Sequence, residues 1–205
     1  MTTNATVPEP AFLFWLDLES TGLDPKQDPK QHGILEMAFI LTEFRYPYRM
    51  VSRGHYLVNS PARLELLEGR SNEFIRSMHE ASGLTIALSF VENTTTLPTI
   101  EQDLLQLSSV WPLEDKNAKV VIAGSSVGFD LSFLRQHLPT FVKRLSYRVF
   151  DVSVMKMVCR SMGMPYEDEK TDPSHRAEDD IEYSIQLMRD CVRWLSTARI
   201  QGSPL

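Results

Sequence analysis

The segment FLFWLDLES, residues 12–20, places two carboxylates, Asp17 and Glu19, in an otherwise apolar run. The run predicts a buried β-strand, and burying unpaired carboxylates is energetically unfavourable. Because side chains two residues apart on a strand point to the same face, Asp17 and Glu19 lie on one side of this strand. A divalent cation would neutralise such a pair, and carboxylate oxygens are the ligands that Mg²⁺ and Mn²⁺ prefer.

The remaining chain alternates between strand-like and helical patterns. Apolar runs predict further strands at 34–43, 49–58, 119–124 and 147–150. Helical spacing is expected at 61–90 with breaks at Gly69 and Ser82–Gly83, after Thr99, and at 128–138, 153–161 and 175–196, with a polar loop at 163–174. A three-strand meander followed by alternating strands and helices predicts an α/β fold, a mixed sheet with helices on both faces. We expect one domain over residues 1–205, with its core at about 12–196 and flexible tails.

Composition limits the classes of partner. The 205 residues are 42% hydrophobic and 23% charged, with a formal net charge of −6, as in a soluble globular protein. Long duplexes are bound largely through phosphate neutralisation, and no Lys/Arg cluster exceeds a pair, so we expect no long-duplex nucleic-acid partner. No run of membrane-helix length and no targeting segment is visible, which favours no membrane and a cytoplasmic location. Cys159 and Cys191 form no CxxC and are expected to be reduced structural thiols.

Two further acids complete a pattern with the first pair. Asp130 follows the apolar run 120–124 near an expected helix start, and Asp180 lies in HRAEDD, residues 175–180. Four carboxylates balance the charge of two divalent cations, which is the composition of a two-metal phosphoryl-transfer site. His175, on the lip before the last helix, could act as general base because an imidazole titrates close to neutral pH.

Each feature alone has a simpler interpretation. An acid pair on a strand is commonplace, the acids at 178–180 would complement a helix dipole, and a histidine before a helix is usually a surface residue. The combination is much more specific: DxE on the first strand, an aspartate after a later buried strand, and HxxxxD opening the last helix. This order favours catalysis.

These motifs resemble the three exonuclease motifs of the DEDD superfamily in its His-containing branch, which has an RNase H-like fold. The segments that carry a closer resemblance, to the oligoribonuclease family over about residues 12–195, are WLDLESTGLDP, ILEMAFILTE, HEASGL, YRVFDVSVMK and HRAEDDI. The resemblance implies a 3′→5′ exoribonuclease that uses two divalent cations, Mg²⁺ or Mn²⁺. Its implied substrate is short single-stranded RNA, dinucleotides to about five nucleotides, with dinucleotides preferred and 5′-mononucleotides released.

The resemblance also implies roles for individual residues. It assigns metal ligation and catalysis to Asp17, Glu19, Asp130 and Asp180, with His175 as the base. It assigns substrate contacts to Leu23 and Phe74 on the two bases, to His79 near the active site, and to Ser126, Arg148, Ser153 and Ser174 around the terminal 5′ phosphate. Tyr147 and Arg148 would reach into a neighbouring subunit's site, which implies a homodimer.

The chain departs from the family pattern at several positions. Phe74 stands where the family has Trp, Ser174 where it has Thr, and Ser125 where it has Asn; the loop 24–33 is longer, and 166–172 is acidic. Phe74 still offers a ring for base stacking. A broader DEDD-type exonuclease resembling the proofreading enzymes, and a non-catalytic module that binds nucleic-acid ends, are the alternatives. A helix-surface role remains open for His79.

Overall fold

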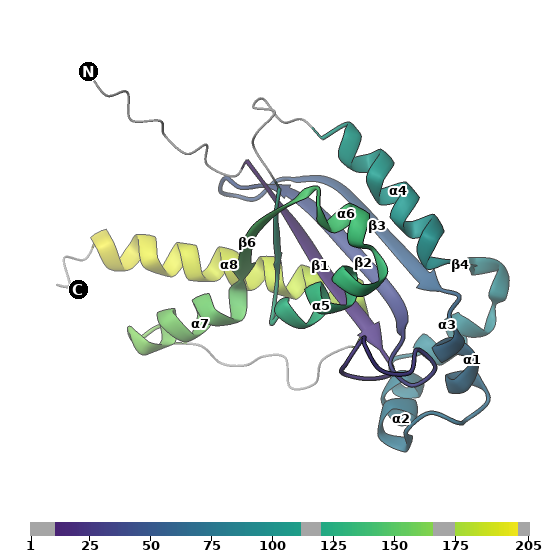
Figure 1. Ribbon diagram of the computed structural model, residues 1–205. Coiled ribbons are helices and arrows are strands. Elements are labelled where there is room, and N and C mark those ends of the chain that lie inside the picture. Colours follow the sequence, from purple (N-terminus) through teal and green to yellow (C-terminus); the bar gives the residue numbers. More distant parts are fainter. Residues whose placement is uncertain (1–10, 112–119, 166–174, 201–205) are drawn as a thin grey trace.

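A computed structural model describes residues 11–111, 120–165 and 175–200 (Figure 1). In these ranges a six-stranded sheet has the order β4-β3-β2-β1-β5-β6. The strands are β1 (Phe12–Ser20), β2 (Ile34–Glu43), β3 (Met50–Val58), β4 (Thr94–Thr95), β5 (Val120–Gly124) and β6 (Leu145–Asp151). The pairs β1–β2 and β2–β3 are antiparallel, whereas β1–β5, β5–β6 and β3–β4 are parallel. The sheet is therefore mixed, as expected.

Helices cover both faces of this sheet (Figure 1). They are α1 (Pro61–Leu67), α2 (Glu73–Ala81), α3 (Leu84–Ser89), the 3₁₀ turn η1 (Val91–Asn93), α4 (Leu97–Ser109), α5 (Gly128–His137), α6 (Pro139–Val142), α7 (Val152–Ser161) and α8 (Ala177–Ile200). One core cluster joins the sheet to α4, α5 and α6, and a second joins its other face to α7 and α8. Among the helices of the described ranges, none combines the length and apolar character that a membrane crossing requires.

Strand β1 lies inside the sheet and contributes to both cores. Phe12, Phe14, Leu16 and Leu18 belong to the cluster with α4, α5 and α6. Leu13 and Trp15 belong to the cluster with α7 and α8. Side chains alternate along a strand, so Asp17 and Glu19 continue the second row toward α8. Helices on both faces explain why this strand is apolar at successive positions rather than at alternate ones.

The element bounds differ from the sequence prediction in a few places. β4 and α6 were not expected, and they are only two and four residues long. Helix α4 begins at Leu97, with Thr96 as its N-cap, rather than after Thr99. Helix α8 begins at Ala177 rather than near 175, because His175 has a φ of 50°, which an α-helix cannot contain. Most of the loop expected at 163–174 lies outside the described residues.

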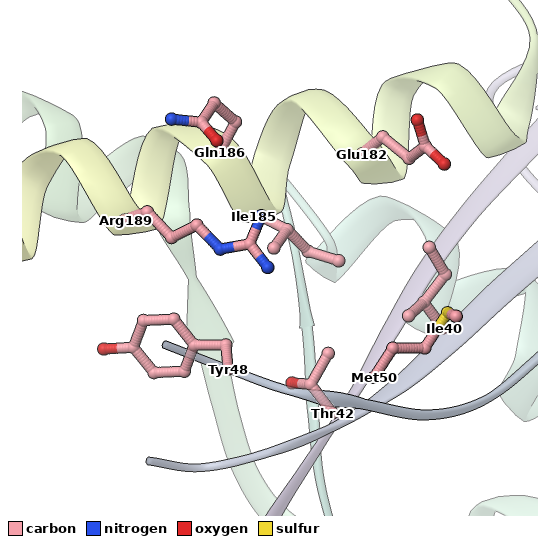
Figure 2. A pocket seen from close by; sticks show the side chains of 8 residues that line it. All are labelled: Ile40, Thr42, Tyr48, Met50, Glu182, Ile185, Gln186 and Arg189. Atoms are coloured by element: carbon pink, nitrogen blue, oxygen red, sulfur yellow. The ribbon is translucent and has the colours of Figure 1, made fainter. Parts of the chain in front are cut away.

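Helix α8 is attached to its neighbours along its length. A shallow groove separates it from the β2–β3 hairpin, and Arg189 points from α8 toward that hairpin (Figure 2). Arg189 Nε donates to the carbonyl oxygen of Pro47 at 3.1 Å.

The two cysteines lie together in the core between α7 and α8. Cys191 of α8 is buried beside Cys159 of α7, and both are free thiols. Burial raises the pKa of Cys191 to about 12, with Cys159 adding to the effect, which fits the expected structural thiols.

Candidate active site

Three of the four predicted carboxylates meet at one end of the central strand. Asp17 and Glu19 come from β1, and Asp180 comes from the first turn of α8. Each offers a carboxylate oxygen, and these three atoms lie within 4.8 Å of one another. Two residues about 160 positions distant from Asp180 in sequence are thus brought against it by the packing of α8 on the sheet. Oxygen atoms at this spacing can coordinate a shared divalent cation.

The fourth carboxylate, Asp130, is held beside this group by a different contact. Its Oδ1 accepts a hydrogen bond from the backbone N–H of Leu18 at 3.0 Å, and the side chain is only 4% exposed. This N–H is available because β5 pairs with β1 only from Leu13 to Trp15. The end of β5 passes very close to β1 at Gly124. Only glycine fits there, since a Cβ would lie 2.7 Å from the Leu16 carbonyl oxygen. Helix α5 begins four residues later, at Gly128, and its Asp130 reaches the part of β1 that β5 leaves unpaired.

Burial makes these carboxylates difficult to ionise. It raises the pKa of Asp17 well above its ordinary value, and the charges of Asp130, Glu19 and Asp180 raise it further. Burial likewise raises the pKa of Glu19 to about 8 and that of Asp130 to about 7. The positive charge that the protein places near these three carboxylates is too small to offset the cost of ionising them. The donor set therefore fits hard divalent cations, which would supply that charge.

Of the two predicted histidines, His79 contacts one of the acids and His175 lies near His79. His79 of α2 is 0% exposed; its Nε2 lies 3.2 Å from the Ser20 carbonyl oxygen and its Nδ1 lies 3.9 Å from Glu19 Oε2. Burial lowers the pKa of His79, and the nearby His175 lowers it further. The helix-surface interpretation of His79 is therefore wrong. His175 is half-buried and has a left-handed backbone, a conformation uncommon outside glycine and often found at functional sites.

Glu36 was not singled out from the sequence, yet it lies in this site. It is paired with Glu19 across the β1–β2 ladder and is 0% exposed. Its carboxylate accepts from Arg176 Nη2 at 2.8 Å and from the Ala177 N–H at 3.0 Å, and it lies 2.7 Å from His55 Nε2. Burial alone would raise the pKa of Glu36, but these hydrogen bonds hold it at about 2. The sequence did contain a signal for Glu36, because it is an acid inside the apolar run ILEMAF, as Asp17 is inside the run at 12–20.

The two residues expected to contact bases are prominent at the surface. Leu23, in the loop after β1, is 80% exposed, and Phe74, in the first turn of α2, is 73% exposed. The Phe74 N–H is bound by the N-cap Asn72. Because His79 of the same helix contacts Ser20 at the end of β1, α2 is docked next to the carboxylates. The side chains of Leu23 and Phe74 are therefore both accessible to a ligand.

The residues expected around a terminal phosphate are partly assembled by Asp151, which the sequence analysis did not single out. Its Oδ1 accepts from the Ser126 N–H at 3.0 Å and from the Ser153 hydroxyl at 2.6 Å. It thereby caps α7 and joins it to the loop after β5, so Ser126 and Ser153 lie side by side. A polar residue directly before a helix is the usual sequence signal of such a cap.

Tyr147 and Arg148 lie on the outer strand β6. The Tyr147 side chain is 83% exposed, and the Arg148 guanidinium carbon lies 4.8 Å from the centre of its ring. Within the described chain neither side chain is drawn into the carboxylate group. Ser174 and the acidic segment 166–172 lie outside the described residues. Ser125, where the family has Asn, shares a 3.0 Å hydroxyl–hydroxyl hydrogen bond with Ser184 of α8.

Comparison with known proteins gives a consistent family. Residues 14–188 match the model of the exonuclease family. Mitochondrial oligoribonuclease of Mus musculus is 36% identical over 181 residues, covering 86% of this chain and 70% of that protein. Oligoribonuclease of Corynebacterium glutamicum (strain R) is 33% identical over 187 residues, covering 90% of this chain and 80% of that protein.

Solved structures of similar fold include two exonucleases. The nuclease domain of 3′hExo, a DEDDh family member bound to rAMP, matches with a TM-score of 0.52 and 15% identity, covering 90% of this chain and 93% of that chain. A moderately thermophilic exonuclease I from Methylocaldum szegediense matches with a TM-score of 0.58 and 17% identity, covering 88% of this chain and 40% of that chain. The expected fold, RNase H-like and of the DEDD type, is confirmed.

Proposed function

The chain belongs to the exonuclease family, on its oligoribonuclease side, and from this premise we propose a metal-dependent 3′→5′ exoribonuclease that degrades very short RNA to 5′-mononucleotides. One observation carries the catalytic part of the proposal: one carboxylate oxygen from each of Asp17, Glu19 and Asp180 lies within 4.8 Å of the other two, at the end of a strand whose residues 12–16 are buried and apolar. A module that only binds nucleic-acid ends would have no need of such a group, which is unfavourable without a cation.

We assign two divalent cations, Mg²⁺ or Mn²⁺, to Asp17, Glu19, Asp130 and Asp180. When bound, the cations supply a water nucleophile that is active at neutral pH and stabilise the charge on the leaving oxygen. Asp130 would turn its second oxygen to this role, since its Oδ1 already accepts the Leu18 N–H. Two of the carboxylates, Glu19 and Asp130, are almost fully buried, so solvent is largely excluded from that side of the group.

We assign the proton transfer to His175 and a substrate contact to His79. His175 has a left-handed backbone and lies two residues before the start of α8, and Asp180 is in the first turn of that helix. A ring nitrogen of His175 would accept the proton of the attacking water. Within the described residues the Nδ1 of His79 has no hydrogen-bond partner although it is buried, and a buried polar atom of this kind is usually satisfied by a ligand or water.

We propose that the substrate is held by its two ends. Leu23 and Phe74 would contact the bases, and Ser126, Arg148, Ser153 and Ser174 would surround the terminal 5′ phosphate. The backbone N–H of Ser126 and the hydroxyl of Ser153 both donate to Asp151, which supports a common location for these two residues. A phosphate monoester carries more charge than an internal diester and forms stronger charge-assisted hydrogen bonds. Dinucleotides are therefore the preferred substrate.

We further propose a homodimer in which Tyr147 and Arg148 complete the partner's site. The successive elements β6 and α7 support this assembly, because they leave several large apolar side chains exposed: Tyr147, Val149, Val154, Met157 and Val158. Exposed apolar patches typically mark protein interfaces. Residues 12–196 would form one catalytic domain. A cytoplasmic location is also proposed; the mammalian relatives are named mitochondrial, so imaging of the intact protein in its cell decides it.

A length series tests the function. RNA and DNA oligomers of two to twenty nucleotides, each 5′-phosphorylated, are incubated with enzyme and Mg²⁺ or Mn²⁺. We expect diribonucleotides to be degraded with the highest kcat/KM, and Asp17→Ala to lose ~100-fold or more, as expected when a key electrostatic group is removed. Equal efficiency on dimers and twenty-mers would favour a broader, proofreading-like exonuclease. No hydrolysis of any oligomer by folded protein would favour a binding module.

A further inference from the structure

Both oxygens of Glu36 are bound by groups of the protein itself. Oε1 accepts from Arg176 Nη2 at 2.8 Å and Nε at 3.0 Å and lies 2.7 Å from His55 Nε2. Oε2 accepts from the Ala177 N–H at 3.0 Å. The carboxylate is 0% exposed, so water does not compete for it. Both oxygens are thus already engaged by cationic or N–H groups of this chain.

Two of the partners of Glu36, Arg176 and Ala177, lie between His175 and Asp180 in the chain. Arg176 directly follows His175, and Ala177 is the first residue of α8, three residues before Asp180. Glu36 itself lies on β2, paired with Glu19 of β1. One side chain therefore connects the strand layer that carries Asp17 and Glu19 with the segment that carries His175 and Asp180. The distant anchor of α8, Arg189 on Pro47, fixes the middle of the helix but not this end.

The backbone at this junction needs such support. His175 adopts a φ of 50°, which is less favourable than a helical or extended backbone for a residue with a Cβ. The N–H groups of a first helical turn have no partners within the helix, and Glu36 satisfies that of Ala177. Without Glu36, the Ala177 N–H and the Arg176 guanidinium at this junction lose their buried hydrogen-bond acceptor on the sheet.

We propose that Glu36 and Arg176 form a clamp that positions His175 and Asp180 over the β1 carboxylates, and that Glu36 is a positioning residue rather than a metal ligand. The inference deepens the proposed function and rests on it for the role of His175 and Asp180. Residues that hold metal ligands in place, without touching the metal, typically change metal affinity or activity by ~10- to 100-fold when removed.

The test uses Glu36→Gln, which keeps the shape, and Arg176→Ala, with Arg176→Lys as the conservative variant. Arg53→Met is the matched control, because it removes an exposed 3.1 Å ion pair, Arg53 with Glu178, between the same sheet and the same helix. Mn²⁺ dissociation constants are measured by electron paramagnetic resonance without substrate, alongside kcat and KM on a 5′-phosphorylated diribonucleotide. Circular dichroism establishes that each variant is folded.

We expect Glu36→Gln and Arg176→Ala to weaken Mn²⁺ binding and lower kcat by ~10-fold or more, as is typical of groups that orient ligands, with KM changed by less than about threefold. Arg176→Lys should retain intermediate values, guanidinium ion should partly restore Arg176→Ala, and Arg53→Met should match wild type. A folded Glu36→Gln or Arg176→Ala protein that binds Mn²⁺ and turns over like Arg53→Met would overturn the clamp. Wild-type protein that binds Mn²⁺ but cleaves no oligomer would refute the proposed function, while the Mn²⁺ comparison would still decide the clamp.

Discussion

Glu19 and Glu36 face each other across the β1–β2 ladder, and we expect the substitution of glutamate by glutamine to have opposite effects on stability at the two positions. Burial raises the pKa of Glu19 to about 8, with the charges of Asp180 and Glu36 adding to it. Burial would also raise the pKa of Glu36, but His55, Arg176 and the Ala177 N–H hold it at about 2. One carboxylate is therefore unfavourable when ionised, and the other is favourable.

The two pKa values set the pH windows. In the unfolded chain a glutamate ionises near 4.5, so metal-free protein should lose stability on account of Glu19 as the pH rises from 4.5 to about 8. The full difference corresponds to about 5 kcal/mol at ~1.4 kcal/mol per tenfold change in acid dissociation. Glu36 acts with the opposite sign: it contributes about 3 kcal/mol above pH ~4.5, and this contribution is lost as the pH falls toward 2.

Coupling reduces what a single substitution reveals. Because the charges of neighbouring carboxylates contribute to the raised pKa of Glu19, we expect Glu19→Gln to recover only part of the difference, about 1–3 kcal/mol at pH 8. For a chain of this size that raises the melting temperature of the metal-free protein by roughly 3–10 °C. Glu36→Gln should instead lower it by a similar or larger amount, because Arg176 loses its buried partner.

Thermal unfolding followed by circular dichroism checks both signs. Melting temperatures are compared at pH 5 and pH 8 in excess EDTA and then with Mn²⁺, with Glu43→Gln at the end of β2 as control. The gain from Glu19→Gln should shrink at pH 5, where the folded wild type already holds the proton. Added Mn²⁺ should stabilise wild type and not Glu19→Gln, because only wild type keeps the ligand. If Glu19→Gln is no more stable than wild type in EDTA at pH 8, the assignment of an uncompensated buried charge is wrong.

Three further outcomes are expected. His175→Ala should lower kcat by ~100-fold or more, the usual contribution of a general base, while leaving dinucleotide affinity in Ca²⁺ within about threefold; equal losses in both would indicate a positioning role. Mixing an Asp180→Ala chain with a Tyr147→Ala/Arg148→Ala chain should restore measurable activity if sites are shared between subunits, and a demonstrated heterodimer without activity would indicate a site built from one chain. Arg148→Ala should weaken a 5′-phosphorylated dinucleotide by ~10-fold or more yet change a seven-mer much less, since one charge-assisted hydrogen bond contributes about 1.5–3 kcal/mol; uniform weakening across lengths would contradict the phosphate cap.

The expected mixed sheet with helices on both faces follows from patterns of short range. Runs such as 34–43 and the helical spacing at 153–161 specify their elements because apolar periodicity is a local property of the chain. The shortest elements, β4 and α6, escaped prediction because two to four residues carry no measurable period. The start of α8 was placed too early because the left-handed backbone of His175 is imposed by its surroundings rather than by residue type.

The candidate carboxylates were recognisable in the sequence because each is an acid in an apolar or helix-opening context. Only the tertiary structure decided which hydrogen-bond partners each carboxylate has, and hence how its pKa is shifted. Asp130 faces the Leu18 N–H because β5 stops pairing with β1, and Glu36 is paired with Arg176 because α8 begins beside β2. Chemically identical carboxylates thus end with pKa values near 8 and near 2, because burial and the hydrogen-bond donors that reach each group come from other segments of the chain, such as β3 and the start of α8 for Glu36.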